Sequence, residues 1–426
     1  MHVSGTPGRQ TTHPKLNGPD APVAGLALRQ EHVVVVLGFC GLVSAADNWF
    51  VSPALPAIAN TLAVAPTAAA IILTAYLVPY GALQPVCGRI GDGVGRLRLL
   101  RIIVLGLCAG TFLCALAPNL SLLVAARIIT GCFAAGIISV SQAFVGDVVG
   151  PKHRAGAVGI LMGITFTGQG LSAGLGGILT DLVGWRAAFA AFGMLAALAW
   201  LGLFTLRDTG RSPARDSVHP KAQAGKHLPH INPVSSFFRD AWRIFFSPHR
   251  AVFLLACSTG FLFLGTYGLM GTFLSEVCGL TSTRAGLVMM LYGFFCLIGG
   301  ALAGKLGGAR GLGGVISVGE CAGMVSAATL VLSCATGSWI PSLVAAASLG
   351  LGYILVQPTL VTLSMDADPA QSGLCTGLIG FAVFACGGVG PAVGTAVVSC
   401  SGYALLWMLV LLCLGLQALI SRRVLR

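Results

Sequence analysis

The sequence predicts an all-α membrane protein with twelve transmembrane helices, arranged as two pseudo-symmetric halves of six helices each. Hydrophobic residues make up 56% of the 426-residue chain, charged residues make up only 9%, and the mean hydropathy is +0.88. Twelve apolar stretches follow one another, and a polar segment at residues 207–250 divides them into six and six. A chain of this composition would not be soluble in water, so we expect it to be embedded in a lipid bilayer.

The predicted spans lie between charges, turns and Pro/Gly clusters. Each has about 20 residues and is long enough to cross a hydrocarbon core of roughly 30 Å as a helix. They cover residues 33–53, 67–88, 99–117, 122–144, 156–180, 187–206, 251–274, 284–304, 313–335, 340–363, 372–399 and 403–421.

The domain organisation follows from these spans. Residues 32–206 form the N-terminal half, residues 251–421 form the C-terminal half, and residues 207–250 form a cytoplasmic linker. Residues 1–31 lack apolar periodicity and predict a disordered cytoplasmic tail. The apolar run that follows this tail is too long for a removable signal peptide and lacks a small-residue cleavage pattern. A short basic tail, residues 422–426, is expected to be cytoplasmic as well.

The distribution of basic residues predicts the orientation in the membrane, because Lys and Arg accumulate in cytoplasmic loops. With both termini inside, 22 of the 25 basic residues fall on the cytoplasmic side, and only Arg127, Arg186 and Arg284 do not. The formal charge of +12 is therefore a topological signal. Nucleic-acid binding is disfavoured, because the basic residues are dispersed among hydrophobic spans. We expect a multi-pass protein of the bacterial inner membrane.

The two halves resemble each other in sequence. Residues Leu123–Arg127 of the fourth span match Leu343–Ala347 of the tenth, and Gly88–Arg98 aligns with Gly300–Arg310, at offsets of about 220 and 212 residues. This pattern indicates an internal duplication, as in transporters built from two parallel six-helix repeats. Several glycines also have small-xxx-small spacing, which lets membrane helices approach closely: Gly159 and Gly163, Gly170 and Gly174, Gly300 and Gly304, Gly373 and Gly377.

No metal or cofactor site is expected. The fourteen cysteines include no CxxC and no zinc-type spacing with histidine, so most are interpreted as small buried thiols, and oxidation of Cys278 with Cys400 stays open. The eight histidines lie in tails, loops or the linker, which disfavours a membrane-embedded enzyme. A G-x-x-x-x-G-K-S/T phosphate loop is absent from the sequence, which disfavours ATP-driven pumping.

Asp47 is the most informative residue, because it lies about fourteen residues into the first apolar run, just before a segment broken by Pro53 and Pro56. An ionised acid at that depth costs roughly 3 kcal/mol or more, so such acids mark ion or substrate pathways. A low-dielectric cavity favours the neutral carboxyl, which binds and releases a proton as water access alternates. The alternative is a structural carboxyl beside a broken helix. Arg127 lies at a comparable depth, and pairing would lower the cost of burying both charges.

Glu320 is a second intramembrane acid, about seven residues from the cytoplasmic end of the ninth span. We favour a structural carboxyl at a helix contact for Glu320 and keep proton coupling as the alternative. Glu276, at the outer end of the seventh span, is expected to face water.

The segment Gly88-Arg89-Ile90-Gly91-Asp92-Gly93-Val94-Gly95-Arg96-Leu97-Arg98 between the second and third spans resembles the loop motif of the major facilitator superfamily, G-x-x-x-D-R/K-x-G-R-R/K. Residues Arg127–Gly131 are similar to the R-x-x-x-G pattern of the drug/proton antiporters in this superfamily. Asp47, with the Pro-Ala-Leu-Pro segment that follows it, resembles the first-helix signature of the same antiporters. The departures are Gly93 in place of a basic residue, and a fifth span, Ser172–Gly177, that lacks the antiporters' Gly-Pro pair.

This resemblance covers the whole membrane region and implies alternating access between two half-domains, with the first, fourth, seventh and tenth helices lining a central cavity. It also implies a conformational network in which an arginine of the loop bridges to an acid at the end of the fourth helix. The residues that match this network or its loop are Gly88, Asp92, Gly95, Arg96, Arg98 and Asp147. Ordinary solvated charges are the competing interpretation.

The predicted function is a proton-coupled secondary transporter that exports drugs or small organic metabolites, acting as a monomer among membrane lipids. Aromatic walls with few fixed charges suit amphipathic organic molecules. The alternative is a proton-coupled importer of a sugar, amino acid or organic acid; a channel or receptor would not explain the loop motif. The residues expected to line the substrate cavity are Trp49, Tyr76, Gln169, Tyr267, Tyr292, Tyr353 and Gln357.

Overall fold

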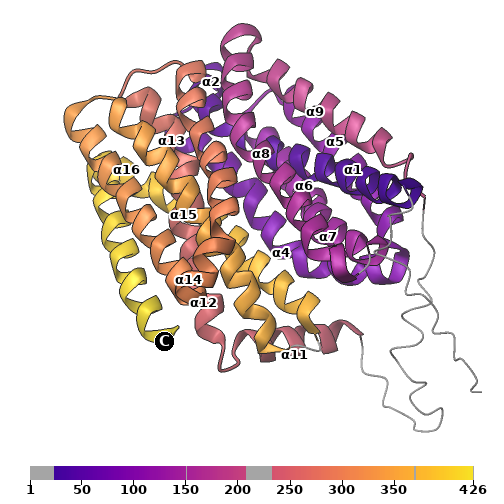
Figure 1. The fold of residues 1–426 in the computed structure, drawn as a ribbon. Helices are drawn as coiled ribbons and strands as arrows, with labels where there is room; N and C mark the ends of the chain where they lie inside the picture. The colour runs from indigo at the N-terminus through magenta and orange to yellow at the C-terminus, as the bar shows by residue number, and fades with distance from the viewer. Residues whose placement is uncertain (1–23, 150, 208–232, 369–370, 426) are drawn as a thin grey trace, which may run out of the picture.

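The computed structural model of the chain describes residues 24–149, 151–207, 233–368 and 371–425, and these residues form a helical bundle (Figure 1). The helices, in chain order, are α1 (Ala24–Trp49), α2 (Val51–Leu62), α3 (Pro66–Ala69), α4 (Ile71–Val94), α5 (Arg96–Leu116), α6 (Leu120–Ala134), α7 (Ile137–Val148), α8 (Pro151–Val183), α9 (Trp185–Gly202), α11 (Pro233–Phe245), α12 (Arg250–Thr259), a π-helical turn (Gly260–Leu264), α13 (Gly265–Glu276), α14 (Ser282–Thr336), α15 (Ile340–Ser364), a 3-10 turn (Met365–Ala367) and α16 (Ser372–Val424).

The all-α membrane fold class is confirmed. Among the described residues, ten helical segments are long and apolar enough to cross a membrane. The last of them, Leu374–Val424, has 51 residues and is interrupted by Gly402, whose φ of 79° lets the chain fold back between two predicted spans. Helix α8, with 33 residues, also has the length of a span. The count of twelve stays a prediction.

Proline and a single turn residue break the first span. Helix α1 ends at Trp49, Phe50 forms a turn, and α2 continues to Leu62. Pro53 and Pro56 supply no backbone N–H, so neither can donate to the carbonyl four residues before it. The predicted break is therefore found directly after Asp47, but the helical path extends beyond the predicted end at residue 53.

The two halves repeat the same helix contact. A Cβ atom added at Gly131 of α6 would lie 2.3 Å from the carbonyl oxygen of Tyr76 on α4, and one added at Gly350 of α15 would lie 2.1 Å from that of Tyr292 on α14. Each glycine thus allows the second and fourth spans of its half to touch through their backbones. The separate placement of the halves is visible in Figure 1, where the indigo-to-magenta helices lie on one side and the orange-to-yellow helices on the other.

The helix pairs that join the halves include α2 with α13, α8 with α14, and α4 with α16. A Cβ atom at Gly170 would lie 2.2 Å from the Cα of Gly293, so α8 and α14 meet backbone to backbone. At the end of the same pair, the Thr283 N–H donates to Asp181 Oδ2 at 2.7 Å. Gly163 also lies on α8, but nothing is within 4 Å of the Cβ it would carry. The small-residue spacing therefore marks a tight contact at one of these α8 glycines and not at the other.

The polar segments outside the bundle are partly helical. Helix α1 begins at Ala24, inside the segment predicted to be disordered, where Ala24 to Glu31 is composed mostly of good helix formers. Residues 1–23 and 208–232 lie outside the described residues. The linker predicted at residues 207–250 contains helix α11, which no apolar run had indicated. All fourteen cysteines are free, including Cys278 and Cys400.

Candidate functional site

Asp47 and Arg127 form a buried ion pair inside the N-terminal half. Asp47 lies near the end of α1 and Arg127 in the middle of α6, and the Arg127 guanidinium donates to Asp47 Oδ2 at 2.8 Å. The same nitrogen donates to the Asp47 carbonyl oxygen at 3.1 Å. The exposed fractions of the two side chains are 0% for Arg127 and 1% for Asp47. The pairing predicted from their similar depth is therefore present in the structure.

Three further side chains complete the surroundings of the pair. Thr111 of α5 donates its hydroxyl to Asp47 Oδ1 at 2.8 Å, and Arg127 donates to Asn48 Oδ1 at 3.2 Å. The ring of Tyr76 lies 4.2 Å from the guanidinium carbon of Arg127, within range of a cation–π contact. The pair thus joins α1, α4, α5 and α6. Sequence reasoning had missed Thr111, because a threonine in an apolar helix is ordinary.

The polar cluster is not fully hydrogen-bonded. Ser44 Oγ, Asn48 Nδ2 and Arg127 Nε are buried and have no hydrogen-bond partner in the described part of the chain. An unpaired buried polar group costs about 1–3 kcal/mol. The cluster therefore keeps unused hydrogen-bonding groups beside the ion pair.

Four of the predicted cavity residues form a continuous row of aromatic rings that crosses from one half to the other. The ring centroids of Trp49 and Tyr267 lie 4.9 Å apart, those of Tyr267 and Tyr292 4.2 Å, and those of Tyr292 and Tyr353 6.2 Å. Gln169 of α8 donates its amide to the Tyr292 hydroxyl at 3.3 Å. All five side chains are buried. This row, Trp49–Tyr267–Tyr292–Tyr353 with Gln169, is named the interface row below.

The other two predicted cavity residues lie elsewhere. Tyr76 covers Arg127 and donates its hydroxyl to the Ser44 carbonyl at 3.1 Å, so it belongs to the ion-pair cluster. Gln357 is half-buried on α15, and the described part of the chain offers it no hydrogen bond. Gln357 follows Tyr353 by four residues, one helical turn farther along α15.

The loop motif lies where α4 turns into α5. Gly95 links the two helices with a φ of 100°, a conformation that side-chain-bearing residues rarely adopt. Arg96 forms an ion pair with Asp147 at the end of α7 and donates to the Ala143 carbonyl, so this predicted bridge is present. Arg98 is exposed. Gly88 and Asp92 both lie on α4, and their burial and contacts are outside what the structure describes.

Glu320 is fully buried within the C-terminal half. The Ser421 hydroxyl of α16 donates to Glu320 Oε2 at 2.5 Å, while Glu320 Oε1 has no partner in the described part of the chain. Gln417, one turn earlier on α16, donates to Thr259 at 2.9 Å. Glu320 is thus placed at a contact between α14 and α16, remote in the fold from the Asp47–Arg127 pair. The placement favours the structural interpretation. Glu276 is exposed, as expected, and accepts a hydrogen bond from the Tyr403 hydroxyl at 3.0 Å.

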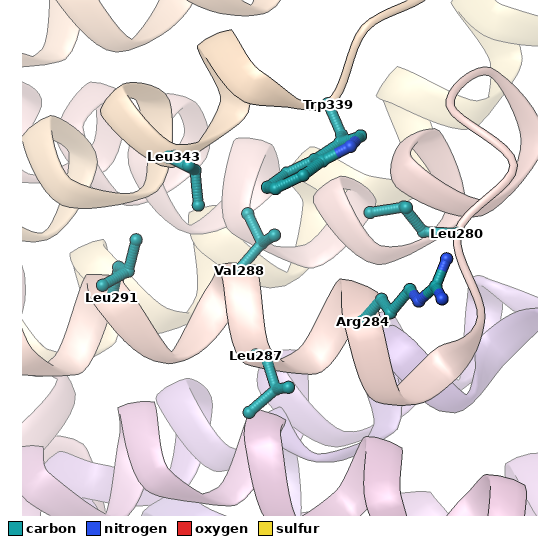
Figure 2. A pocket seen from close by; sticks show the side chains of 7 residues that line it. All are labelled: Leu280, Arg284, Leu287, Val288, Leu291, Trp339 and Leu343. Atoms are coloured by element: carbon teal, nitrogen blue, oxygen red, sulfur yellow. The ribbon is translucent and has the colours of Figure 1, made fainter.

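A pocket of about 390 Å³ lies outside the interface row, between the beginnings of α14 and α15. Figure 2 shows the Trp339 ring above Val288, with Arg284 at one end, and no residue of the interface row lines this pocket. Among the described residues, no group of His, Cys, Asp and Glu side chains could hold a metal ion. The residues that line this pocket are Leu280, Arg284, Leu287, Val288, Leu291, Trp339 and Leu343.

A family model described as Major Facilitator Superfamily matches residues 37–391. The chain belongs to the major facilitator superfamily. Its fold is similar to that of a bacterial homologue of the human lysosomal transporter Spinster, solved in an inward-facing and unoccupied conformation, with a TM-score of 0.67 over 93% of this chain and 97% of that one, at 18% identity. The family and the fold are those of membrane transporters.

The curated relatives of this major facilitator chain include exporters and resistance proteins. Citrate exporter 1 of Aspergillus niger is 25% identical over 65% of this chain and 57% of its own length. Puromycin resistance protein pur8 of Streptomyces alboniger is 30% identical over 43% and 37%. Multidrug resistance protein 1 of Bacillus subtilis is 25% identical over 60% of each. The chain spans less than two thirds of the length of each of these relatives.

Proposed function

We propose that this major facilitator protein exports amphipathic organic compounds in exchange for protons. The observation that carries the proposal is the buried Asp47–Arg127 pair, which joins four helices of one half. A charge pair without solvent contact is costly to bury, so a functional use explains its presence best. Protons, a small organic substrate and membrane lipids are the partners.

Proton binding changes the forces within the cluster. When Asp47 takes up a proton, its attraction for Arg127 falls, and Arg127 keeps only the Asn48 amide, the Asp47 carbonyl and the Tyr76 ring. The guanidinium can then turn so that its unpaired Nε–H donates to a new acceptor. Because Tyr76 and Arg127 lie on different helices, this turn shifts α4 against α6 and biases the two halves toward one open state.

The interface row supports an amphipathic substrate. It offers ring faces, three phenol groups and one amide, with no charged residue among its members. Its rings come from both halves, so a rocking motion of the halves would separate them and uncover their faces. Large aromatic surfaces bind apolar bodies, and the phenols orient a polar end.

Export is favoured over import by the names of the relatives, which include a citrate exporter and two resistance proteins. The proposed setting is the bacterial inner membrane, with both termini in the cytoplasm and a monomer as the working unit. A proton-coupled importer on the same fold is the second candidate. The two differ in direction: an exporter accumulates substrate in inside-out vesicles, and an importer does so in right-side-out vesicles.

The test is transport in proteoliposomes with an imposed pH gradient, across a panel of cationic, neutral and anionic compounds. Asp47→Asn is expected to abolish gradient-driven flux while substrate binding is preserved, because the amide keeps the shape of the carboxyl but cannot exchange a proton. Glu320→Gln serves as the matched control, since Glu320 is also buried but lies at another contact, and its flux should stay near wild type. Unchanged flux in Asp47→Asn would refute coupling at this pair.

A further inference from the structure

Helix α11 has a surface that the bundle does not explain. Its thirteen residues, Pro233–Phe245, lie in the basic linker between the two halves. One side of the helix faces the protein: Ile244 is 2% exposed, and the Phe245 ring lies 5.3 Å from the ring of Phe253 on α12. Arg243 donates to Asp368 at 3.0 Å, in the turn between α15 and α16. Helix α11 is therefore fixed to the C-terminal half.

Next to this contact side lies an exposed aromatic stripe. Phe238, Trp242 and Phe246 follow one another at four-residue spacing and are 64%, 69% and 54% exposed. The rings of Trp242 and Phe246 touch, with centroids 4.3 Å apart. Residues four apart share one face of a helix, so the three rings form a continuous apolar surface. An exposed apolar surface made of three aromatic rings is unfavourable in water.

The charged residues of the segment lie on a third side. At 100° per residue, Arg239 stands on the side of the aromatic stripe that is away from Ile244 and Phe245. Arg243 lies on the same side as Arg239 and is bound to Asp368. In the described part of the chain, the side chain of Arg239 forms no hydrogen bond or ion pair, and neither does the side chain of Arg250, which begins α12. The exposed surface of α11 thus combines three rings with a cationic border.

The position of α11 relative to the spans decides what covers this surface. Helix α11 ends at Phe245, and the membrane span Arg250–Glu276 begins five residues later. In Figure 1, α11 runs crosswise under the ends of α12 and α15 rather than along the bundle. An amphipathic helix in this position lies in the plane of the headgroups, with its apolar side toward the acyl chains.

We propose that α11 docks the C-terminal half onto a leaflet of anionic phospholipid. The Phe238–Trp242–Phe246 stripe enters the boundary between headgroups and acyl chains, and Arg239 and Arg250 contact lipid phosphates. Tryptophan is a favoured residue at this depth, because its ring is amphipathic. The inference requires only that the chain is embedded in a membrane, and it is independent of the substrate and of proton coupling.

The test is quenching of Trp242 fluorescence by lipids brominated along the acyl chain, with the whole protein in nanodiscs. The emission of Trp242 is obtained as the difference between wild type and Trp242→Phe. A matched control is the difference between wild type and Trp407→Phe, since Trp407 is buried with 0% exposure. We expect Trp242 emission to be blue-shifted and quenched at least twofold more by bromines near the headgroup than by bromines near the chain end. Trp407 should not be quenched by either.

Two outcomes would overturn the proposal. If Trp242 emits at the wavelength of solvated tryptophan and is quenched by aqueous iodide, the stripe faces water. If Trp242 is blue-shifted but neither lipid nor iodide quenches it, protein covers the stripe, from another part of the chain or a second copy. The contact with the lipid headgroups is tested separately. In mixed nanodiscs, brominated phosphatidylglycerol should quench Trp242 more than brominated phosphatidylcholine. This ratio should fall to one in Arg239→Gln/Arg250→Gln, and an unchanged ratio would contradict the role of the arginines.

Discussion

Arg127 and Asp47 are stabilised mainly by each other, because both are removed from solvent. A buried pair of this kind contributes little net stability compared with an apolar pair of the same shape, but removing one partner strands the other charge. The ion pair therefore makes the two residues energetically interdependent, and this interdependence can be measured without any knowledge of the substrate.

We expect Arg127→Gln alone to lower the free energy of unfolding by about 3 kcal/mol, because Asp47 is left without its counter-charge in a buried site. The double variant Asp47→Asn/Arg127→Gln should recover most of that loss, since two amides need no counter-charge. Thermal unfolding in detergent, followed by tryptophan fluorescence, measures both effects. Equal stability of the single variant and wild type, or a double variant less stable than the single one, would rule out this interdependence.

Among the helices, the tightest test concerns α8 and α14, which meet at Gly170 and Gly293. A methyl group at Gly170 would lie 2.2 Å from the Cα of Gly293, so the helices must separate. Gly170→Ala is expected to cost about 1–3 kcal/mol of stability and to slow transport. Gly163→Ala on the same helix meets nothing within 4 Å and should leave both unchanged. Thermal unfolding and transport flux are measured for both variants. Equal effects of Gly170→Ala and Gly163→Ala would contradict the prediction that Gly170 is needed for the close helix contact.

The positions of most helices and of the breaks between them could be predicted from the sequence. Long apolar runs predicted the spans, and Gly/Pro clusters predicted the breaks, because both signals depend on the residues of the element itself. Helix α11 was missed, although Phe238, Trp242 and Phe246 have helical spacing. Its apolar stripe covers only one side of a short basic segment, so a search for continuous apolar runs passes over it.

The site was predictable only where chemistry identified the partner. A buried acid and a buried base at similar depth pair with each other, so Asp47 and Arg127 were found together. The bridge between Arg96 and Asp147 was predicted from the family resemblance instead. The aromatic residues carried no such information, and Tyr76 was assigned to the cavity although it covers Arg127. Asp181 was not singled out, because its partner is the backbone N–H of Thr283, which every residue type except proline possesses.

For the molecule as a whole, the two halves share a contact pattern but not a charge pattern. Arg127 aligns with Ala347 in the internal repeat, so the C-terminal half has no counterpart of the buried cation. The proposed response to protons therefore belongs to one half. What holds the halves together must then lie at their shared surface, and Asp181 of α8 is the charged group that bonds to the first turn of α14 there.

The Asp181 bond should be insensitive to mild acid. Burial acts to raise the pKa of Asp181, but hydrogen bonds from Thr283 and its neighbours outweigh burial and hold the pKa below its ordinary value. A lowered pKa means that the bond is present above the ordinary carboxyl range and is lost only as the pH falls through the lowered value. Between about pH 7 and pH 5, the contact should therefore persist.

Hydrogen–deuterium exchange at the Thr283 amide measures this contact directly. Asp181→Ala should speed exchange roughly threefold to tenfold, because the amide loses a charged acceptor, and Asp181→Asn should have a smaller effect since an amide oxygen still accepts. Asp366→Ala, an exposed acid in the turn after α15, controls for a general change in charge. After correction for intrinsic rates, wild-type protection should stay constant from about pH 7 to pH 5. Loss of protection within that range would make the junction of the halves itself a proton sensor and would displace Asp47 from that role.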